Sequence, residues 1–182
     1  AKSYGEKVIY RSLDFTVEAW ARVSAIGETL TVFSSWASGA KGHWMYADGG
    51  GTWRGGVGDG GVNYYVPGPT GDDLVAANEW VHLALVNGAS GLRFYVNGIY
   101  NGVNYADFDR NNSAPLIIGG APPALSSQGP FKGVIDEVAV YTKALTQAQL
   151  QAHVQAALYG NNSAPVFLPV EMPTGDYYGG HR

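Results

Sequence analysis

The chain has 182 residues, of which 46% are apolar and only 14% are charged, and its formal net charge at pH 7 is −4. A chain of this length favours one domain that is large enough to bury a sizeable core. The weak negative charge excludes the basic footprint of nucleic-acid binding, and the absence of cysteine excludes disulfides, thiolate zinc sites and thiol catalysis.

Short strands separated by Gly, Asn, Asp and Pro are predicted along most of the chain. The segment 15–23 alternates apolar and polar residues, which indicates a strand with one buried face. Further strands are predicted at 30–36, 43–47, 80–86, 92–96, 116–120 and 134–141. The segment 80–86 is apolar on both faces and indicates a central strand, and Asn97-Gly98 predicts a tight hairpin turn. The number and spacing of these strands favour a β-sandwich or barrel.

One helix is predicted near the end of the chain. Thr146 and Gln149 form a capping box, and Leu150, Val154 and Leu158 follow at helical spacing, so we place the helix at about residues 147 to 158. Residues 161–182 carry prolines and glycines without periodicity, which favours an extended tail or linker after a domain that spans 1–160. No apolar run approaches the roughly 18 residues that cross a bilayer, so we expect no membrane insertion.

Four stretches occur in a characteristic order: FTVEAW at 15–20, EWVHLA at 79–84, LRFYVNG at 92–98 and FKGVIDEVAVY at 131–141. Together they resemble the laminin G-like, concanavalin A-like lectin and glucanase domains. The resemblance implies an all-β fold, a two-sheet antiparallel jelly-roll sandwich with one short C-terminal α-helix. The Gly-rich first strand of the family is expected to be shortened or absent, because only about a dozen residues precede the 15–23 strand.

The sequence lacks the catalytic pattern of the hydrolases in this family. Related laminarinase-type enzymes carry two glutamates that flank an aspartate on one strand, and a retaining mechanism needs two carboxyl groups about 5 Å apart. Asp136 and Glu137 are adjacent, so they should point to opposite faces of a strand. Asp107 and Asp109 lie in a loop with no third carboxylate nearby in the sequence. We therefore expect that the protein is not an enzyme.

Asp136 is the candidate metal ligand. Strand parity places it on one face with the valines at 134, 138 and 140, and a carboxylate on an apolar face must be paired, hydrogen-bonded or metal-bound. By resemblance to the hydrolase relatives, an aspartate at this place contributes to one structural calcium ion, which takes oxygen ligands. Alternatively, Asp136 accepts hydrogen bonds from backbone N–H groups or pairs with Arg11 or Arg22.

The segment 43–65 combines the aromatic and planar polar side chains that sugar binding requires. With Met45 turned inward, its two neighbours should point outward, and the glycines of 55–61 would let a ligand approach the backbone. The candidate carbohydrate-binding residues are Trp44, Tyr46, Trp53, Arg54, Asp59, Asn63 and Tyr65. The other tryptophans, Trp20, Trp36 and Trp80, are expected to be packing residues. A crowded aromatic cluster is also compatible with the inside of a curved sheet that the 161–182 tail covers.

These observations predict a non-catalytic, lectin-like carbohydrate-binding module with a polysaccharide or glycan as its partner. The resemblance implies an extracellular or cell-surface location and neighbouring domains of a larger secreted or surface protein, of bacterial or phage type. The alternative is a protein–protein adhesion module or a structural module of a cell-surface or virion assembly, because exposed aromatic patches serve that role equally well.

Overall fold

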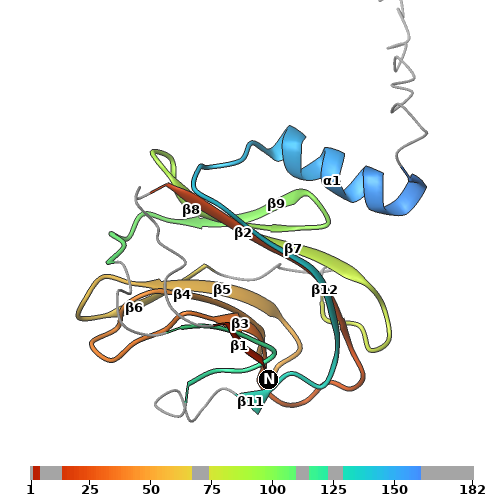
Figure 1. Ribbon diagram of the computed structural model, residues 1–182, viewed down its shortest axis with the longest axis horizontal. Coiled ribbons are helices and arrows are strands. Elements are labelled where there is room, and N and C mark those ends of the chain that lie inside the picture. The colour runs from red at the N-terminus through yellow and green to blue at the C-terminus, as the bar shows by residue number, and fades with distance from the viewer. Residues whose placement is uncertain (1, 5–13, 67–73, 110–114, 123–128, 161–182) are drawn as a thin grey trace, which may run out of the picture.

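The computed structural model describes residues 2–4, 14–66, 74–109, 115–122 and 129–160. These residues form two sheets that face each other, with one helix over the outer side of the smaller sheet (Figure 1). The domain boundary predicted at residue 160 and the tail predicted at 161–182 lie at or outside the end of the described residues. The jelly-roll sandwich with one C-terminal helix is confirmed.

The larger sheet is antiparallel except where β11 pairs with β3 in parallel. Its strands, in spatial order, are β1 (Lys2–Tyr4), β10 (Leu116–Ile118), β3 (Leu30–Ser34), β4 (His43–Ala47), β5 (Trp53–Gly58) and β6 (Asn63–Val66), with β11 (Gly129–Pro130) beside β3. Strand β1 covers the three described residues near the start of the chain, and the residues on either side of it lie outside the described ones.

The smaller sheet is antiparallel throughout. Its strands, in spatial order, are β12 (Gly133–Tyr141), β2 (Phe15–Val23), β7 (Val81–Gly88), β8 (Gly91–Val96) and β9 (Ile99–Asn104). Strand β7 lies in the middle, as its two apolar faces predict. The turn between β8 and β9 is built on Asn97 and Gly98, with φ angles of 51° and 74°, and it confirms the predicted hairpin.

The inner faces of the two sheets form one apolar core. Every second residue of β2 is fully buried there, and these residues are Phe15, Val17, Ala19, Ala21 and Val23. His43 of β4 is also fully buried, with its ring centroid 4.9 Å from that of Phe15 and 5.3 Å from that of Phe33. Burial lowers the pKa of His43 to about 3, so the imidazole is neutral at pH 7.

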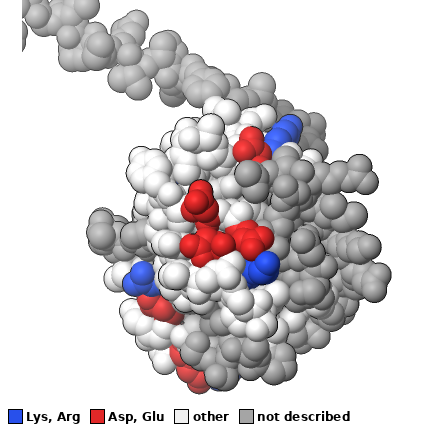
Figure 2. All heavy atoms as spheres, turned by 90° about the vertical axis from the view of Figure 1, so that its left-hand side faces the viewer, with Lys and Arg blue, Asp and Glu red and all other residues white. Residues whose placement is uncertain are grey.

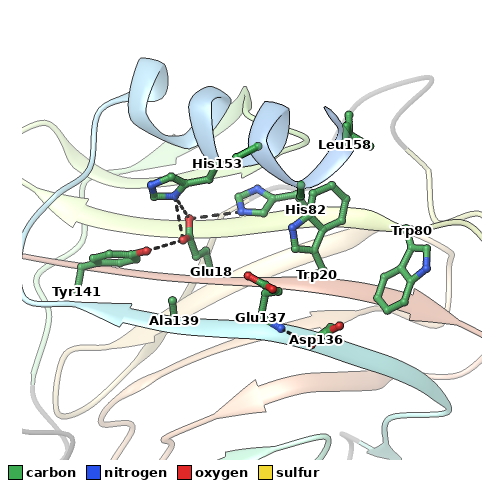
Figure 3. Close-up of a pocket in the computed structure, with 12 residues that line it drawn as sticks. Glu18, Trp20, Trp80, His82, Asp136, Glu137, Ala139, Tyr141, His153 and Leu158 are labelled. Atoms are coloured by element: carbon green, nitrogen blue, oxygen red, sulfur yellow. Dashed lines mark hydrogen bonds and ion pairs between the residues drawn. The ribbon is translucent and has the colours of Figure 1, made fainter. Parts of the chain in front are cut away.

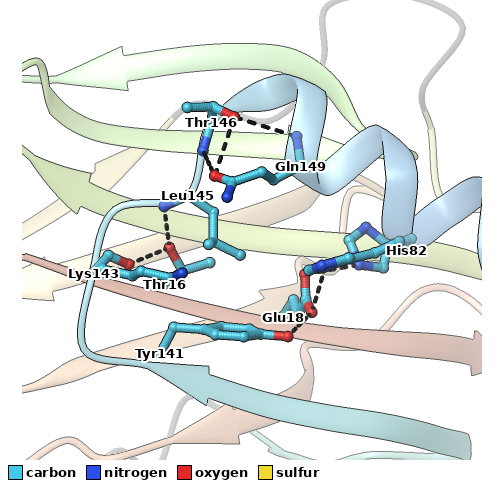
Figure 4. A network of polar contacts seen from close by, with 9 residues as sticks. Thr16, Glu18, His82, Tyr141, Lys143, Leu145, Thr146 and Gln149 are labelled. Carbon is cyan, nitrogen blue, oxygen red and sulfur yellow. Dashed lines mark hydrogen bonds and ion pairs between the residues drawn. The ribbon is translucent and has the colours of Figure 1, made fainter.

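Helix α1 (Gln147–Tyr159) begins with the predicted capping box. The Thr146 hydroxyl accepts a hydrogen bond from the backbone N–H of Gln149, and the Gln149 side chain accepts one from the backbone N–H of Thr146 (Figure 4). Leu150 packs with Ala84 and Tyr95 on the outer face of the smaller sheet. The capping box therefore sets the first residue of the helix, and Leu150 marks the side of the helix that packs on the sheet.

Strand β12 contains a bulge that the sequence did not reveal. Its register against β2 shifts between Asp136 and Ala139, and Glu137 adopts a φ of 51°. As a result Val138 and Val140 pack toward the core, while Asp136 stays exposed beside the exposed Val134. The prediction that Asp136 shares a face with Val138 and Val140 is wrong, because a bulge resets the alternation of side chains along a strand.

Charged side chains are sparse on the described surface. Figure 2 shows acidic side chains gathered near the middle of the face that lies at the left in Figure 1, with single basic side chains around them. Lys41 and Asp109 form an exposed ion pair at 2.9 Å, and Lys132 pairs with Glu28. Exposed pairs of this kind contribute at most about 1 kcal/mol each. Within the described part of the chain, no helix is long and apolar enough to cross a membrane.

Candidate functional site

The hydrogen-bonded register of β4, β5 and β6 brings most of the predicted sugar-binding residues onto one face. Trp44 lies opposite Gly56, and Gly56 lies opposite Tyr65, so the three residues form a row across the strands. Tyr46 lies opposite Arg54 in a second row. We call this outer surface of β4–β6 the aromatic face. Met45 lies on the opposite side, buried in the core, as predicted.

Only part of the aromatic face is accessible to a ligand. Trp44 is fully buried and Tyr46 is 9% exposed, whereas Tyr65 is 39% exposed. The Tyr65 ring meets the other two rings edge to face, with centroids 5.8 Å from Trp44 and 6.4 Å from Tyr46. Edge-to-face contacts between aromatic rings are favourable. The two buried rings therefore hold Tyr65 in place, and Tyr65 is the ring that a ligand can reach.

An ion pair lies beside these rings. The Arg54 guanidinium donates a hydrogen bond to the Asp48 carboxylate, which also accepts hydrogen bonds from the backbone N–H groups of Gly50 and Thr52. Although burial alone would raise the pKa of Asp48, these hydrogen bonds hold it below its usual value. The charged pair therefore keeps one orientation at the edge of the aromatic face.

Three of the residues predicted to bind carbohydrate instead make contacts within the protein. Trp53 points into the core and is 2% exposed, because it neighbours Arg54 on β5 and so faces the other side of the sheet. Asp59 lies in the turn between β5 and β6, where its carboxylate accepts the backbone N–H groups of Gly61 and Val62. The Asn63 amide oxygen accepts a hydrogen bond from the Trp36 indole at 3.1 Å.

A second candidate site was not found from the sequence. A groove of about 620 Å³ lies between α1 and the outer face of the smaller sheet (Figure 3). Its walls include Trp20, Trp80, Asp136, Glu137 and Leu158. Trp80 was expected to be a packing residue, but it lies just before β7 and is 43% exposed, so that prediction is wrong. We call this cavity the helix groove.

A buried carboxylate forms one end of the helix groove. Glu18 is 5% exposed; its carboxylate accepts a hydrogen bond from the Tyr141 hydroxyl at 2.8 Å and lies 3.0 Å from His153 Nδ1 and 3.4 Å from His82 Nε2 (Figures 3 and 4). Burial alone would raise the pKa of Glu18, but the contacts with His82, His153 and Tyr141 lower it to about 2. Burial and the hydrogen bond to Glu18 raise the pKa of Tyr141 to about 12.

This network connects four elements that are distant in the sequence. Glu18 belongs to β2, His82 to β7, Tyr141 to β12 and His153 to α1. Its contacts therefore hold α1 against the sheet and fix one wall of the helix groove. At neutral pH the Glu18 carboxyl is ionised and hydrogen-bonded, which suits a structural role better than that of a general acid.

Asp136 lies on the rim of the helix groove. Its carboxylate accepts a hydrogen bond from the backbone N–H of Glu137 at 2.9 Å, which is one of the alternatives considered from the sequence (Figure 3). In the part of the chain that the structure describes, no three His, Cys, Asp or Glu side chains come together as metal ligands. The calcium ion expected at Asp136 therefore stays a prediction.

Residues 4–151 match the model of the family described as the Concanavalin A-like lectin/glucanases superfamily, of laminin G type. The chain belongs to this family, as the four ordered motifs predicted. No curated protein matches the sequence.

Solved structures of carbohydrate-binding modules share the fold. The IT-sialidase CBM40 of Ruminococcus gnavus, bound to α2,3 sialyllactose, has a TM-score of 0.63 and 14% identity over 80% of this chain and 84% of its own. Domain 4 of AbnA, an extracellular arabinanase from Geobacillus stearothermophilus, was solved with arabinotriose and has a TM-score of 0.59 and 23% identity over 79% of this chain and 68% of its own. A pentraxin from Limulus polyphemus has a TM-score of 0.59 and 21% identity over 78% of this chain and 70% of its own.

Proposed function

We propose that the protein is a non-catalytic carbohydrate-binding module that holds a glycan against Tyr65 on the aromatic face. The observation that carries the proposal is the support of one exposed ring by two buried rings. The apolar face of a sugar ring stacks on a flat aromatic side chain, and a ring that is already fixed loses little conformational entropy when it binds.

The ion pair of Arg54 and Asp48 supplies the polar half of such a site. It offers both hydrogen-bond donors and acceptors to sugar hydroxyls, in an orientation that the turn between β4 and β5 fixes. Trp44 and Tyr46 have a supporting role, because they are buried. Trp53 is not part of the proposed site.

The absence of catalysis is part of the proposal. Glu18 is the one buried carboxylate among the described residues, and its pKa of about 2 is far below the range of a glycosidase general acid. Two of the structural neighbours are sugar-binding domains of a sialidase and of an extracellular arabinanase. By analogy, we propose that this module belongs to a larger secreted or surface protein.

Affinity electrophoresis against a panel of polysaccharides, followed by calorimetry with the oligosaccharide that binds, tests this function. We expect Tyr65→Ala to weaken binding by about fivefold or more, since one stacked ring contributes on the order of 1 kcal/mol or more. The matched control is Tyr100→Ala, because Tyr100 is 46% exposed and rests on a buried tyrosine of the other sheet. Equal affinities for the wild type and Tyr65→Ala would contradict the site.

Protein–protein adhesion is the competing function. Strand β9 lies at an edge of the smaller sheet and exposes Ile99 and Tyr100, which are 56% and 46% exposed. Exposed apolar side chains on an edge strand favour association with another protein. If the protein binds no polysaccharide in a broad panel but binds a partner protein through β9, that result would favour adhesion over glycan binding.

A further inference from the structure

The helix groove has a distinct chemical character. Its described lining holds the carboxylates of Glu18, Asp136 and Glu137 and no Lys or Arg. Glu18 is occupied by its own network, whereas Asp136 and Glu137 are exposed at the rim. Neither rim carboxylate forms an ion pair with a described side chain. The lining therefore carries negative charge, and the Arg22 guanidinium, although not among the lining residues, lies near one wall beside Trp80.

The bulge in β12 directs both rim carboxylates to the same side. Adjacent residues of a regular strand point to opposite faces, yet Asp136 and Glu137 both line the groove (Figure 3). Glu137 reaches this position with a φ of 51°, a backbone conformation that favours glycine. A bulge that redirects side chains, with a strained residue at its centre, is typical of a functional site.

Tryptophan side chains form the apolar part of the groove. Trp20 and Trp80 both line it, and Trp80 is 43% exposed. The Arg22 guanidinium lies over one face of the Trp80 ring, 5.4 Å from its centroid, so a sugar ring would stack on the other face. Exposed tryptophan faces attract both sugar rings and positively charged groups.

One wall of the groove also contains an unpartnered polar atom. His82 is 1% exposed, and its Nδ1 has no hydrogen-bond partner in the described structure, while its Nε2 faces Glu18 at 3.4 Å. Buried polar atoms are nearly always hydrogen-bonded, so this atom is an exception, although it is itself buried and is not accessible from the groove.

From these features we infer that the helix groove is a second binding site, and that its ligand is a glycan whose sugars carry protonated amino groups. The ammonium group pairs with Asp136 and Glu137, and the sugar ring stacks on Trp80. A cavity of about 620 Å³ lies within the range of small-ligand sites. The inference rests on the proposed function only for the statement that the ligand is a glycan.

A basic peptide is the other cationic ligand that the charge alone would accept. Peptides that bind an edge strand need a regular row of backbone groups, and β12 is the edge strand beside the groove. The shift of register between Asp136 and Ala139 interrupts that row. The rings of Trp20 and Trp80 and the interrupted edge together favour an amino sugar over an extended peptide.

Calorimetry with glucosamine oligomers tests the inference, with the N-acetylated oligomers of the same length as the matched ligand. We expect the charged oligomer to bind at least about tenfold more tightly, and to bind less tightly as salt is added. The variant Trp80→Ala and the double variant Asp136→Asn/Glu137→Gln should each weaken binding by about tenfold or more. Tyr65→Ala, on the aromatic face, should leave this binding unchanged.

The outcomes separate this inference from the proposed function. Equal binding of the charged and acetylated oligomers, or full binding by the groove variants, would overturn the second site. If an oligolysine peptide binds the groove and the glucosamine oligomer does not, the inference is also wrong. Loss of amino-sugar binding in Tyr65→Ala would instead assign the ligand to the aromatic face. Thermal unfolding of each variant shows whether the fold is retained.

The variant Glu137→Gly provides a second test, because it should weaken ligand binding while the protein stays fully folded. Glycine accepts the φ of 51° more easily than glutamate, so this variant should unfold at the same or a higher temperature. It should nevertheless bind the glucosamine oligomer more weakly, by about threefold or more, because one rim carboxylate is lost. Unchanged binding by a folded Glu137→Gly protein would argue against the inference.

Discussion

The outer faces of the two sheets are built in different ways. The aromatic face comes from three strands that follow one another in the chain, and its charges neutralise each other in the pair of Arg54 and Asp48. The helix groove is assembled from β2, β7, β12 and α1, with contacts such as Glu18–His153 that span 135 residues, and it is acidic. One sandwich can therefore present two surfaces with different ligand chemistry.

The two sheets also differ in the polar group that each one buries. The larger sheet buries a neutral imidazole, His43, in the core. The smaller sheet buries an ionised carboxylate, Glu18, under α1. A neutral buried group is sensitive to being charged, whereas a charged buried group is sensitive to losing its partners. Mutation and acid should therefore affect the two sides separately.

Removal of the buried carboxylate should have the largest effect. Glu18→Ala leaves His82, His153 and Tyr141 without their acceptor and should lower the free energy of unfolding by about 3–5 kcal/mol, since each buried donor left unsatisfied costs about 1–3 kcal/mol. Urea denaturation followed by circular dichroism measures this change. The control Glu28→Ala removes an exposed partner of Lys132 and should cost less than about 1 kcal/mol. Similar losses in the two variants would show that the buried network contributes little.

Mild acid should destabilise the protein through His43. In the folded protein the pKa of His43 is about 3, compared with 6.5 when it is exposed, so below pH 6.5 the unfolded chain binds a proton that the folded protein does not. Stability is therefore complete above pH 6.5 and is lost as the pH falls toward 3. The loss at pH 4.5 should be about 3 kcal/mol, from about 1.4 kcal/mol per pH unit.

Urea denaturation at several pH values between 7 and 4.5 checks this expectation. Glu18 should contribute little to the pH dependence in this range. Its pKa falls from the usual 4.5 in the unfolded chain to about 2 in the folded protein, so the stability that it provides is lost only below pH 4.5. His43→Gln removes the titrating group and should flatten the dependence on pH, whatever its effect at pH 7. A variant that retains the full dependence would show that other groups cause it.

Local patterns in the sequence predicted much of the fold. The alternation in 15–23, the capping box at Thr146 and the Asn97-Gly98 turn depend on neighbouring residues, and each was found where it was expected. Strands β5, β6 and β9 were not among the segments assigned from alternation. The sequence of β5, WRGGVG, is rich in glycine and has no clear alternation of apolar and polar residues. Its pairing with neighbours, rather than its own composition, makes it a strand.

The candidate sites could be predicted only in part. Trp44 and Tyr46 were assigned correctly to the face opposite Met45, because alternation along β4 decides it. That Tyr65 joins them follows only from the pairing of β5 with β6, and β6 was not predicted as a strand. Parity gave the wrong face for Asp136, because the bulge is not visible in the residue types. The helix groove was not predicted at all. Nothing in the sequence shows that α1 lies over Glu18, since that contact depends on the path of the whole chain.

The variant Gly56→Ala, which adds one methyl group, should affect ligand binding on the aromatic face but not in the helix groove. Of the three changes in stability predicted here, its effect should be the smallest. A Cβ at Gly56 would lie 2.6 Å from the Trp44 indole, so Gly56→Ala forces the ring to move and should cost about 2 kcal/mol. Because Trp44 supports Tyr65, the variant should bind glycans less tightly on the aromatic face and bind amino sugars in the helix groove as before.

The matched control is Gly49→Ala in the turn after β4, where a Cβ would make only ordinary contacts at 3.8 Å or more. Calorimetry with both kinds of ligand, and thermal unfolding, compare the two variants. If Gly56→Ala is folded and binds every glycan as the wild type does, Trp44 does not position Tyr65. If it weakens both kinds of binding equally, the two faces are coupled through the core, and the separation proposed for them fails.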